Sequence, residues 1–174
     1  MIDEVRAEFL RYKTLAEKAI AQLNDHELSA SPPGGGNSIA TVCWHVSGNL
    51  RSRFTEFLTT DGEKPWRQRE EEFEPRAVSG AEILAKWERG WDVLLGTLAD
   101  LSDHQLDATV LIRGQSLRVS EALLRALAHV SYHVGQIVYA AKATRGREWT
   151  YLSIPPGQSA QYNQHPTLDR PPKQ

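Results

Sequence analysis

The chain has 174 residues, enough for one domain that buries about 70% of its unfolded surface without disulfides. Its hydrophobic and charged fractions, 40% and 24%, are those of an ordinary soluble globular protein. A net charge of −2 gives no electrostatic basis for binding nucleic acid or an anionic membrane. The single cysteine, Cys43, excludes an intramolecular disulfide and a cysteine-rich metal site. With no signal peptide and no long apolar run, the expected location is the cytoplasm.

The first two predicted helices are separated by a proline- and glycine-rich break. Apolar residues recur at helical spacing over residues 2–23 and predict the first helix there. Residues 31–36 read Ser-Pro-Pro-Gly-Gly-Gly, a composition that ends a helix. The second helix is expected to begin at Asn37 or Ser38, both favourable N-caps, and to continue to about Leu58.

A third helix is predicted over residues 79–98. Ser79 and Glu82 have the spacing of a capping box, in which each side chain bonds to the backbone of the other residue. Trp87 and Trp91 stand four apart on the apolar face of this helix. We interpret both tryptophans as core residues and not as a stacking platform.

The long charged connection over residues 59–78 is a candidate functional segment. A long connection in a compact domain is usually functional, so we expect it to pass over or near the functional cleft. Its residues Asp61, Lys64, Trp66 and Arg67 offer charge and an aromatic face to a polar substrate.

The last third of the chain is predicted to contain a hairpin, a helix and an irregular tail. Residues 108–112 and 115–119 are two short runs around a glycine-containing turn, which is typical of a β-hairpin. Ser120 is expected to cap a helix that extends to about Thr144. Prolines and glycine punctuate the tail, residues 149–174, and indicate irregular structure.

Two strings recur and divide the chain into two helix pairs of common plan. The tripeptide His-Val-Ser occurs at residues 45–47 and 129–131, on the second and fourth predicted helices. The junctions that precede these helices, residues 23–28 and 101–106, are also alike, Leu-Asn-Asp-His-Glu-Leu and Leu-Ser-Asp-His-Gln-Leu. We therefore predict one all-α domain over residues 1–174, an antiparallel four-helix bundle with a small β-hairpin before the last helix.

Three histidines form the candidate metal site. His129 and His133 are four apart on one helix, so they stand above one another on one face and can bind the same ion. His45 occupies the matching tripeptide and is a candidate third ligand. An isolated histidine is more often an ordinary core or surface residue, but a pair with a repeat-related third favours a metal. Three imidazoles leave coordination positions open, which suits a catalytic ion better than a structural one.

Three polar residues are candidates for a catalytic role beside the metal. Asn49 takes the position that corresponds to His133 in the repeat and is a candidate for orienting water or substrate. Gln136 lies on the same stripe of the last helix as His129 and His133 and has the same candidate role. Glu56 is the nearest candidate general base by helical phase, although it is three turns from His45.

The chain resembles the DinB/YfiT-like superfamily of metal-binding four-helix bundles over nearly its whole length. The resemblance rests on residues 37–39, on 44–46 and on His-Val-Ser-Tyr-His-Val-Gly-Gln-Ile at 129–137. Residues 57–66 and 152–155 are similar to an uncharacterised branch of it. The resemblance implies a divalent metal, zinc or nickel, and a homodimer. Relatives include metal-dependent hydrolase candidates and transferases that use bacillithiol- or mycothiol-type thiols.

Two classes of function are open from the sequence. The first is a metal-dependent enzyme acting on a small molecule, either a hydrolase or a transferase whose partner is a low-molecular-weight thiol. Thiol transfer is slightly favoured, because the metal stabilises a thiolate directly and no protein base is required. The alternative is a non-catalytic metal-binding stress-response or interaction module. The substrate itself is not encoded in any motif of the chain.

Overall fold

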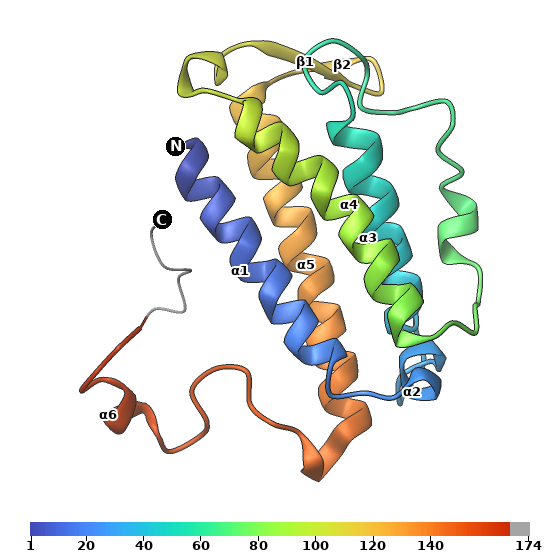
Figure 1. The fold of residues 1–174 in the computed structure, drawn as a ribbon, viewed down its shortest axis with the longest axis vertical. Coiled ribbons are helices and arrows are strands. Elements are labelled where there is room, and N and C mark those ends of the chain that lie inside the picture. Colours follow the sequence, from blue (N-terminus) through green and yellow to red (C-terminus); the bar gives the residue numbers. More distant parts are fainter. Residues whose placement is uncertain (168–174) are drawn as a thin grey trace.

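The computed structural model describes residues 1–167, which are mostly helical with one small antiparallel sheet (Figure 1). The α-helices are α1 (Ile2–Ile20), α2 (Asp25–Ser29), α3 (Ile39–Phe54), α4 (Gly80–Asp100), α5 (Val119–Arg145) and α6 (Ser159–Tyr162). Short 3-10 turns are η1 (Glu70–Phe73), η2 (Asp103–Gln105) and η3 (Gly146–Glu148), and the strands are β1 (Thr109–Ile112) and β2 (Gln115–Arg118). The predicted helical class and the hairpin before the last long helix are therefore confirmed.

The helix directions differ from the predicted antiparallel order, because α3 and α4 run parallel (Figure 1). The Thr97 hydroxyl near the end of α4 donates to the Phe54 carbonyl at the end of α3, at 2.9 Å. At the other end, the Gly80 N–H of α4 donates to Asp25 of α2, just before α3, at 2.8 Å. Residues 55–79 connect them and are long enough to return along the length of α3. Short loops force neighbouring helices to be antiparallel, whereas a long crossover does not.

Helices α1 and α5 form a second parallel pair, which runs opposite to the first. The Ile2 N–H at the start of α1 donates to Asp103 just after the end of α4, at 2.9 Å. Near the other end of α1, the Gln22 side chain donates to the Thr150 carbonyl beyond α5, at 3.0 Å. The most extensive helix packing is thus of α3 with α4 and of α1 with α5, and not within the predicted pairs of α1 with α3 and α4 with α5.

Capping residues explain where most of these helices begin. Ser38 and Ser79 accept hydrogen bonds from the N–H groups of Thr41 and Glu82, as predicted, and the Ser79–Glu82 capping box is complete. The predicted Ser120 cap is wrong, because α5 begins at Val119, after Arg118.

The two similar junctions both begin with a capping box, as the repeat suggests, but one continues as an α-helix and the other as a 3-10 turn. Asn24 and Glu27 form a capping box at the start of α2, and Ser102 and Gln105 form one at η2. The repeat therefore gives the same start to the junction between the two long helices of each half, although the sequence does not predict the short helix α2.

The core lies between the long helices and contains both α4 tryptophans. Trp87 and Trp91 are fully buried, and Phe9 of α1 contacts Trp91 edge-on with ring centroids 6.2 Å apart. Cys43 is also buried among these residues, and its burial raises the pKa of its thiol. Helices α3 and α4 approach closely at Gly90, where a Cβ atom would lie 2.6 Å from the Cα of Ser47.

The hairpin closes one end of the molecule and is attached to the long connection (Figure 1). Thr109 pairs with Arg118 and Ile112 with Gln115. The turn includes Arg113 in the left-handed region, at φ 54°. Asp61 accepts the backbone N–H groups of Arg113 and Gly114, at 2.8 and 2.6 Å, and so attaches the turn to the connection.

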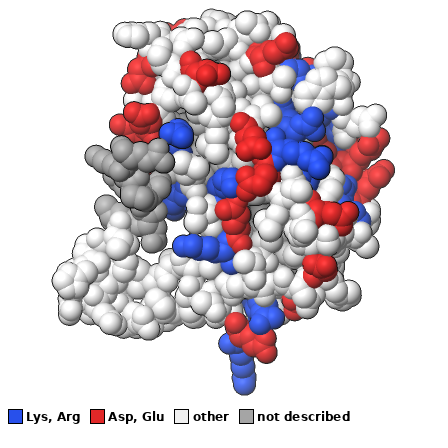
Figure 2. Space-filling view, viewed as in Figure 1, with Lys and Arg blue, Asp and Glu red and all other residues white. Residues whose placement is uncertain are grey.

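The remaining features concern the surface and the tail. Acidic and basic side chains lie beside one another on the face formed by α1 and α4 (Figure 2). Among the described residues, no helix is both long and apolar enough to cross a bilayer. Of the predicted irregular tail, residues 149–167 contain only the short helix α6, and 168–174 lie outside the described residues.

Candidate metal centre

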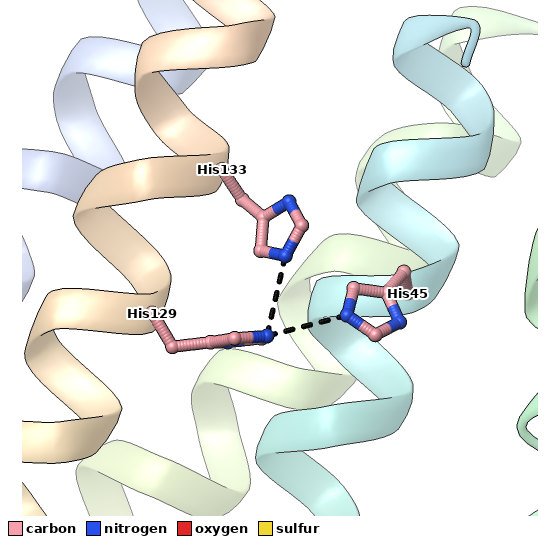
Figure 3. Close-up of side chains that lie close together, drawn as sticks. All are labelled: His45, His129 and His133. Atoms are coloured by element: carbon pink, nitrogen blue, oxygen red, sulfur yellow. Dashed lines mark hydrogen bonds between the residues drawn. The ribbon is translucent and has the colours of Figure 1, made fainter. Parts of the chain in front are cut away.

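The structure brings His45, His129 and His133 together between α3 and α5, where their rings point toward one another (Figure 3). The Nε2 atom of His129 lies 3.2 Å from Nε2 of His45 and 3.2 Å from Nε2 of His133. One ligand nitrogen from each ring lies within 4.8 Å of the other two. The three histidines are therefore close enough to hold one metal ion.

His45 is oriented by a buried carboxylate that the sequence did not identify. Its Nδ1 lies 2.9 Å from Oε2 of Glu72, and Phe73 packs against the ring with centroids 4.7 Å apart. Arg67 holds the same carboxylate through two hydrogen bonds of 2.9 Å. Burial by itself raises the pKa of Glu72, but the bonds to His45 and Arg67 outweigh this and lower it. The ionised carboxylate thus accepts the Nδ1–H of His45, which leaves the lone pair on Nε2.

A glycine on α3 provides the space for this carboxylate. A Cβ atom at Gly48 would lie 2.0 Å from Oε1 of Glu72. Gly48 is three residues after His45 and so lies on the same side of α3. Glu72 can therefore lie against the helix beside His45 only because residue 48 has no side chain.

The two α5 histidines are oriented differently from His45. Nδ1 of His133 lies 2.8 Å from Oε1 of Gln136, so this nitrogen carries the proton and Nε2 carries the lone pair. Nδ1 of His129 is buried, and no hydrogen-bond partner for it exists in the described part of the chain. Burial, and then the neighbouring charges of His133 and His45, lowers the pKa of His129 to about 3. His129 is accordingly neutral at pH 7, the form in which an imidazole binds metal.

The hydrogen bonds around the three rings fit a divalent cation. Glu72 and Gln136 fix His45 and His133 with their Nε2 lone pairs directed toward the same region. The single Nε2 of His129 can donate to only one of them. A cation satisfies all three nitrogens at once. Nitrogens bound tetrahedrally to zinc lie about 3.3 Å apart, close to the two 3.2 Å distances from Nε2 of His129 to Nε2 of His45 and of His133.

A cavity of about 200 Å³ opens beside the histidines. It is formed by α3, the long connection, the hairpin and the first half of α5. Its lining includes His45 and His129, and Asn49 also faces it. The small residues Ala122 and Ala126 of α5 leave room for it next to His129. The site can thus admit a small molecule to the side of the ligand nitrogens.

The other candidate residues have different outcomes. Asn49 lines the cavity together with His45 and His129, and its role in orienting water or substrate stays a prediction. Gln136 bonds to Nδ1 of His133 and so orients that ring. The helical phase used for Glu56 is wrong, because α3 ends at Phe54 and Glu56 has φ 49°. Glu56 is exposed and does not line the cavity.

The long connection passes over the site, as predicted, but most of its named residues have structural contacts. Arg67 lines the cavity, whereas Asp61 accepts hydrogen bonds from the hairpin turn. The Lys64 ammonium is held by the hydroxyl of Thr60 and by the Asp61 carbonyl. Trp66 is 47% exposed and faces the Arg51 guanidinium. Asp61 and Lys64 therefore fix the connection in place.

Comparison with known proteins adds a family to this geometry. Residues 1–158 match the family described as "Protein of unknown function (DUF1572)". The chain belongs to that family. No curated protein and no solved structure matches the chain in these comparisons. The DUF1572 match includes all three histidines, Glu72 and every segment that lines the cavity, so the function has to be argued from the site itself.

Proposed function

We propose that this DUF1572 chain is a metal-dependent enzyme that acts on a small molecule. In this proposal its four long helices form a bundle of the DinB-like type. His45, His129 and His133 hold one divalent ion, zinc or nickel. The chemistry is that of a thiol transferase or a hydrolase.

One observation carries the proposal. Hydrogen bonds at Nδ1 of His45 and of His133 direct the lone pairs of their Nε2 atoms toward Nε2 of His129. Orienting partners of this kind are the usual outer contacts of metal-binding histidines. The described residues offer only these three grouped ligands, so coordination positions are left for a substrate.

The chain's own residues divide the work at this site. The bound ion would supply a Lewis acid that lowers the pKa of a coordinated thiol or water. Glu72 keeps the proton on Nδ1 of His45, and Phe73 covers one side of that ring. Asn49, in the cavity wall, is placed to orient a substrate through its amide.

The lining of the cavity favours a thiol as the nucleophile. Among the described residues that line it there is no Asp or Glu, and therefore no carboxylate to act as a general base on water. Glu56 is excluded from this role by its position outside the cavity. Thiol transfer needs no such base, because a metal stabilises the thiolate.

The test is a panel of low-molecular-weight thiols with electrophilic acceptors, together with esters and amides, assayed on the zinc- or nickel-loaded protein. We expect turnover with the native chain and none with His129→Ala. His26→Ala removes an exposed histidine from α2, outside the site, and is the matched control. Equal activity in the native chain and His129→Ala, or no activity in either, would replace the enzyme proposal by that of a non-catalytic metal-binding module.

A further inference from the structure

Five arginines line the cavity beside the histidines, and they come from four separate segments of the chain. Helix α3 contributes one, the long connection two, the hairpin turn one and α5 one. They are Arg53, Arg67, Arg69, Arg113 and Arg125. The described lining contains no acidic residue. Segments distant in sequence thus bring guanidinium groups to a single small space.

The carboxylates behind the lining do not neutralise these charges. Glu63 serves two of the arginines, because its Oε2 accepts from Arg53 at 3.1 Å and from Arg113 at 2.8 Å. Glu72 pairs with Arg67, and it also accepts from His45. Glu70, which is exposed, pairs with Arg69 at 2.9 Å. Backbone hydrogen bonds lower the pKa of Asp61, and the nearby Arg53 guanidinium lowers it further. Five guanidinium groups therefore face four carboxylates, and a surplus of one positive charge remains.

The arginines differ in what they have free to offer a ligand. Arg53 and Arg67 are held in place, with side chains 14% and 2% exposed, and they contribute a fixed positive field. Arg113 bonds to Glu63 through Nε only, so both of its terminal nitrogens are open. Arg125 is exposed and has no ion pair or hydrogen bond with any described residue. Arg69 bonds to Glu70 through one terminal nitrogen and lies over the Phe73 ring. Arg125 is thus the one cavity arginine without a partner among the described residues, and Arg113 and Arg69 also keep free nitrogens.

We propose that this cavity binds the oxyanion group, a carboxylate or a phosphate, of the substrate of the proposed enzyme, with Arg125 as its main contact. Guanidinium groups present paired N–H donors that match the oxygens of carboxylate and phosphate. A volume of about 200 Å³ suits the acidic end of a small metabolite and not a macromolecule. The anion would lie beside His45 and His129, so the rest of the substrate would reach the ligand nitrogens. That the anion belongs to a substrate rests on the proposed function, but anion binding itself can be measured without a reaction.

The test is titration of the protein with inorganic phosphate and, separately, with acetate, at ionic strength held constant with sodium chloride. Binding is followed by the NMR signals of the arginine Nε–H groups, in metal-free protein and in protein loaded with one zinc and freed of excess. We expect saturable shifts in both forms, and about tenfold weaker binding in Arg125→Gln, the effect of losing one charge-assisted hydrogen bond. Phosphate and acetate arms identify which oxyanion fits better.

Arg147→Gln is the matched control. It removes one exposed arginine beyond the far end of α5 and should leave the affinity unchanged. Equal affinity in Arg125→Gln and Arg147→Gln would overturn the proposal, as would binding that appears only with zinc and is unaffected by Arg125→Gln. Zinc content is measured on the same samples. Anion binding without zinc loading would refute the proposed metal function alone, and zinc loading without anion binding would refute this inference alone.

Discussion

The two His-Val-Ser tripeptides have the same sequence but different surroundings. Both valines are fully buried in the core. His45 on α3 is 5% exposed and is covered by η1, whereas His129 on α5 is half-buried and has no partner at Nδ1 among the described residues. Ser47 donates to the Lys86 carbonyl of α4, but Ser131 donates only within its own helix, to the carbonyl of Ala128.

This difference divides the site into an enclosed side on α3 and an open side on α5. The α3 side is enclosed and fixes one ring through Glu72 and Arg67. The α5 side supplies two candidate ligands on successive turns and faces the cavity with Ala122 and Ala126 beside His129. The tripeptide on α3 thus carries a histidine that is held in one orientation, and the tripeptide on α5 carries a histidine that is open to the cavity. A substitution confined to one side leaves the other side intact and so tests this division.

The largest effect should come from removing a ligand on the α5 side. His133→Ala is expected to lower metal affinity by more than about 100-fold, the upper range for losing a residue that only orients a ligand. His26→Ala should bind metal like the native chain. Metal content and affinity are measured by competition with a chromophoric chelator. Retention of native affinity in His133→Ala would show that the ion is bound without this ring.

A smaller effect should follow from weakening the enclosed side. Glu72→Gln keeps the size of the side chain but removes the charge that holds the proton on His45 Nδ1. We expect metal affinity to fall by about 10- to 100-fold, as is typical for outer partners of metal-bound histidines. The same chelator competition applies, with Glu71→Gln as control, since Glu71 is exposed and adjacent in sequence. A loss in Glu71→Gln as large as that in Glu72→Gln would contradict the specific role of Glu72.

Gly48→Ala should act on the same carboxylate indirectly. The added Cβ would lie 2.0 Å from Oε1 of Glu72, so the carboxylate has to move away from α3. We expect up to about a tenfold loss of metal affinity, the lower end of the range for outer partners. The control is Gly96→Ala on α4, where no atom lies within 4 Å of the added Cβ. If both alanine variants bind metal equally, Gly48 is not needed for placing Glu72.

The smallest effect is expected from the partner of His133. Gln136→Leu removes one exposed hydrogen bond to Nδ1, and a single such bond corresponds to about a 2- to 10-fold change in affinity. Calorimetric titration with zinc would measure it. An effect larger than that of Glu72→Gln would reverse the assignment of orientation to the α3 side.

The sequence was sufficient where the controlling interaction is local. Helical spacing, the Ser79 capping box and the i,i+4 pair of His129 and His133 involve residues within one or two turns. The hairpin was also predicted, from its two short runs around Gly114. His45 was identified because the tripeptide repeats, although its contact with His129 spans 84 residues.

The remaining features depend on tertiary packing. Glu72 is one of three consecutive glutamates, and only the return of the connection along α3 selects it over its neighbours. The parallel direction of α3 and α4 follows from the same long connection and leaves no local signal. The predicted helix extends four residues beyond Phe54, where α3 ends, so helical spacing from His45 does not apply to Glu56.

We propose above all that the three histidines hold one divalent ion through their Nε2 atoms. Zinc X-ray absorption spectroscopy of protein loaded with one equivalent tests it most directly. We expect three imidazole nitrogens at about 2.0–2.1 Å from the ion, falling to two in His129→Ala. A zinc shell without imidazole scattering, or one that is identical in the native chain and in His129→Ala, would contradict it.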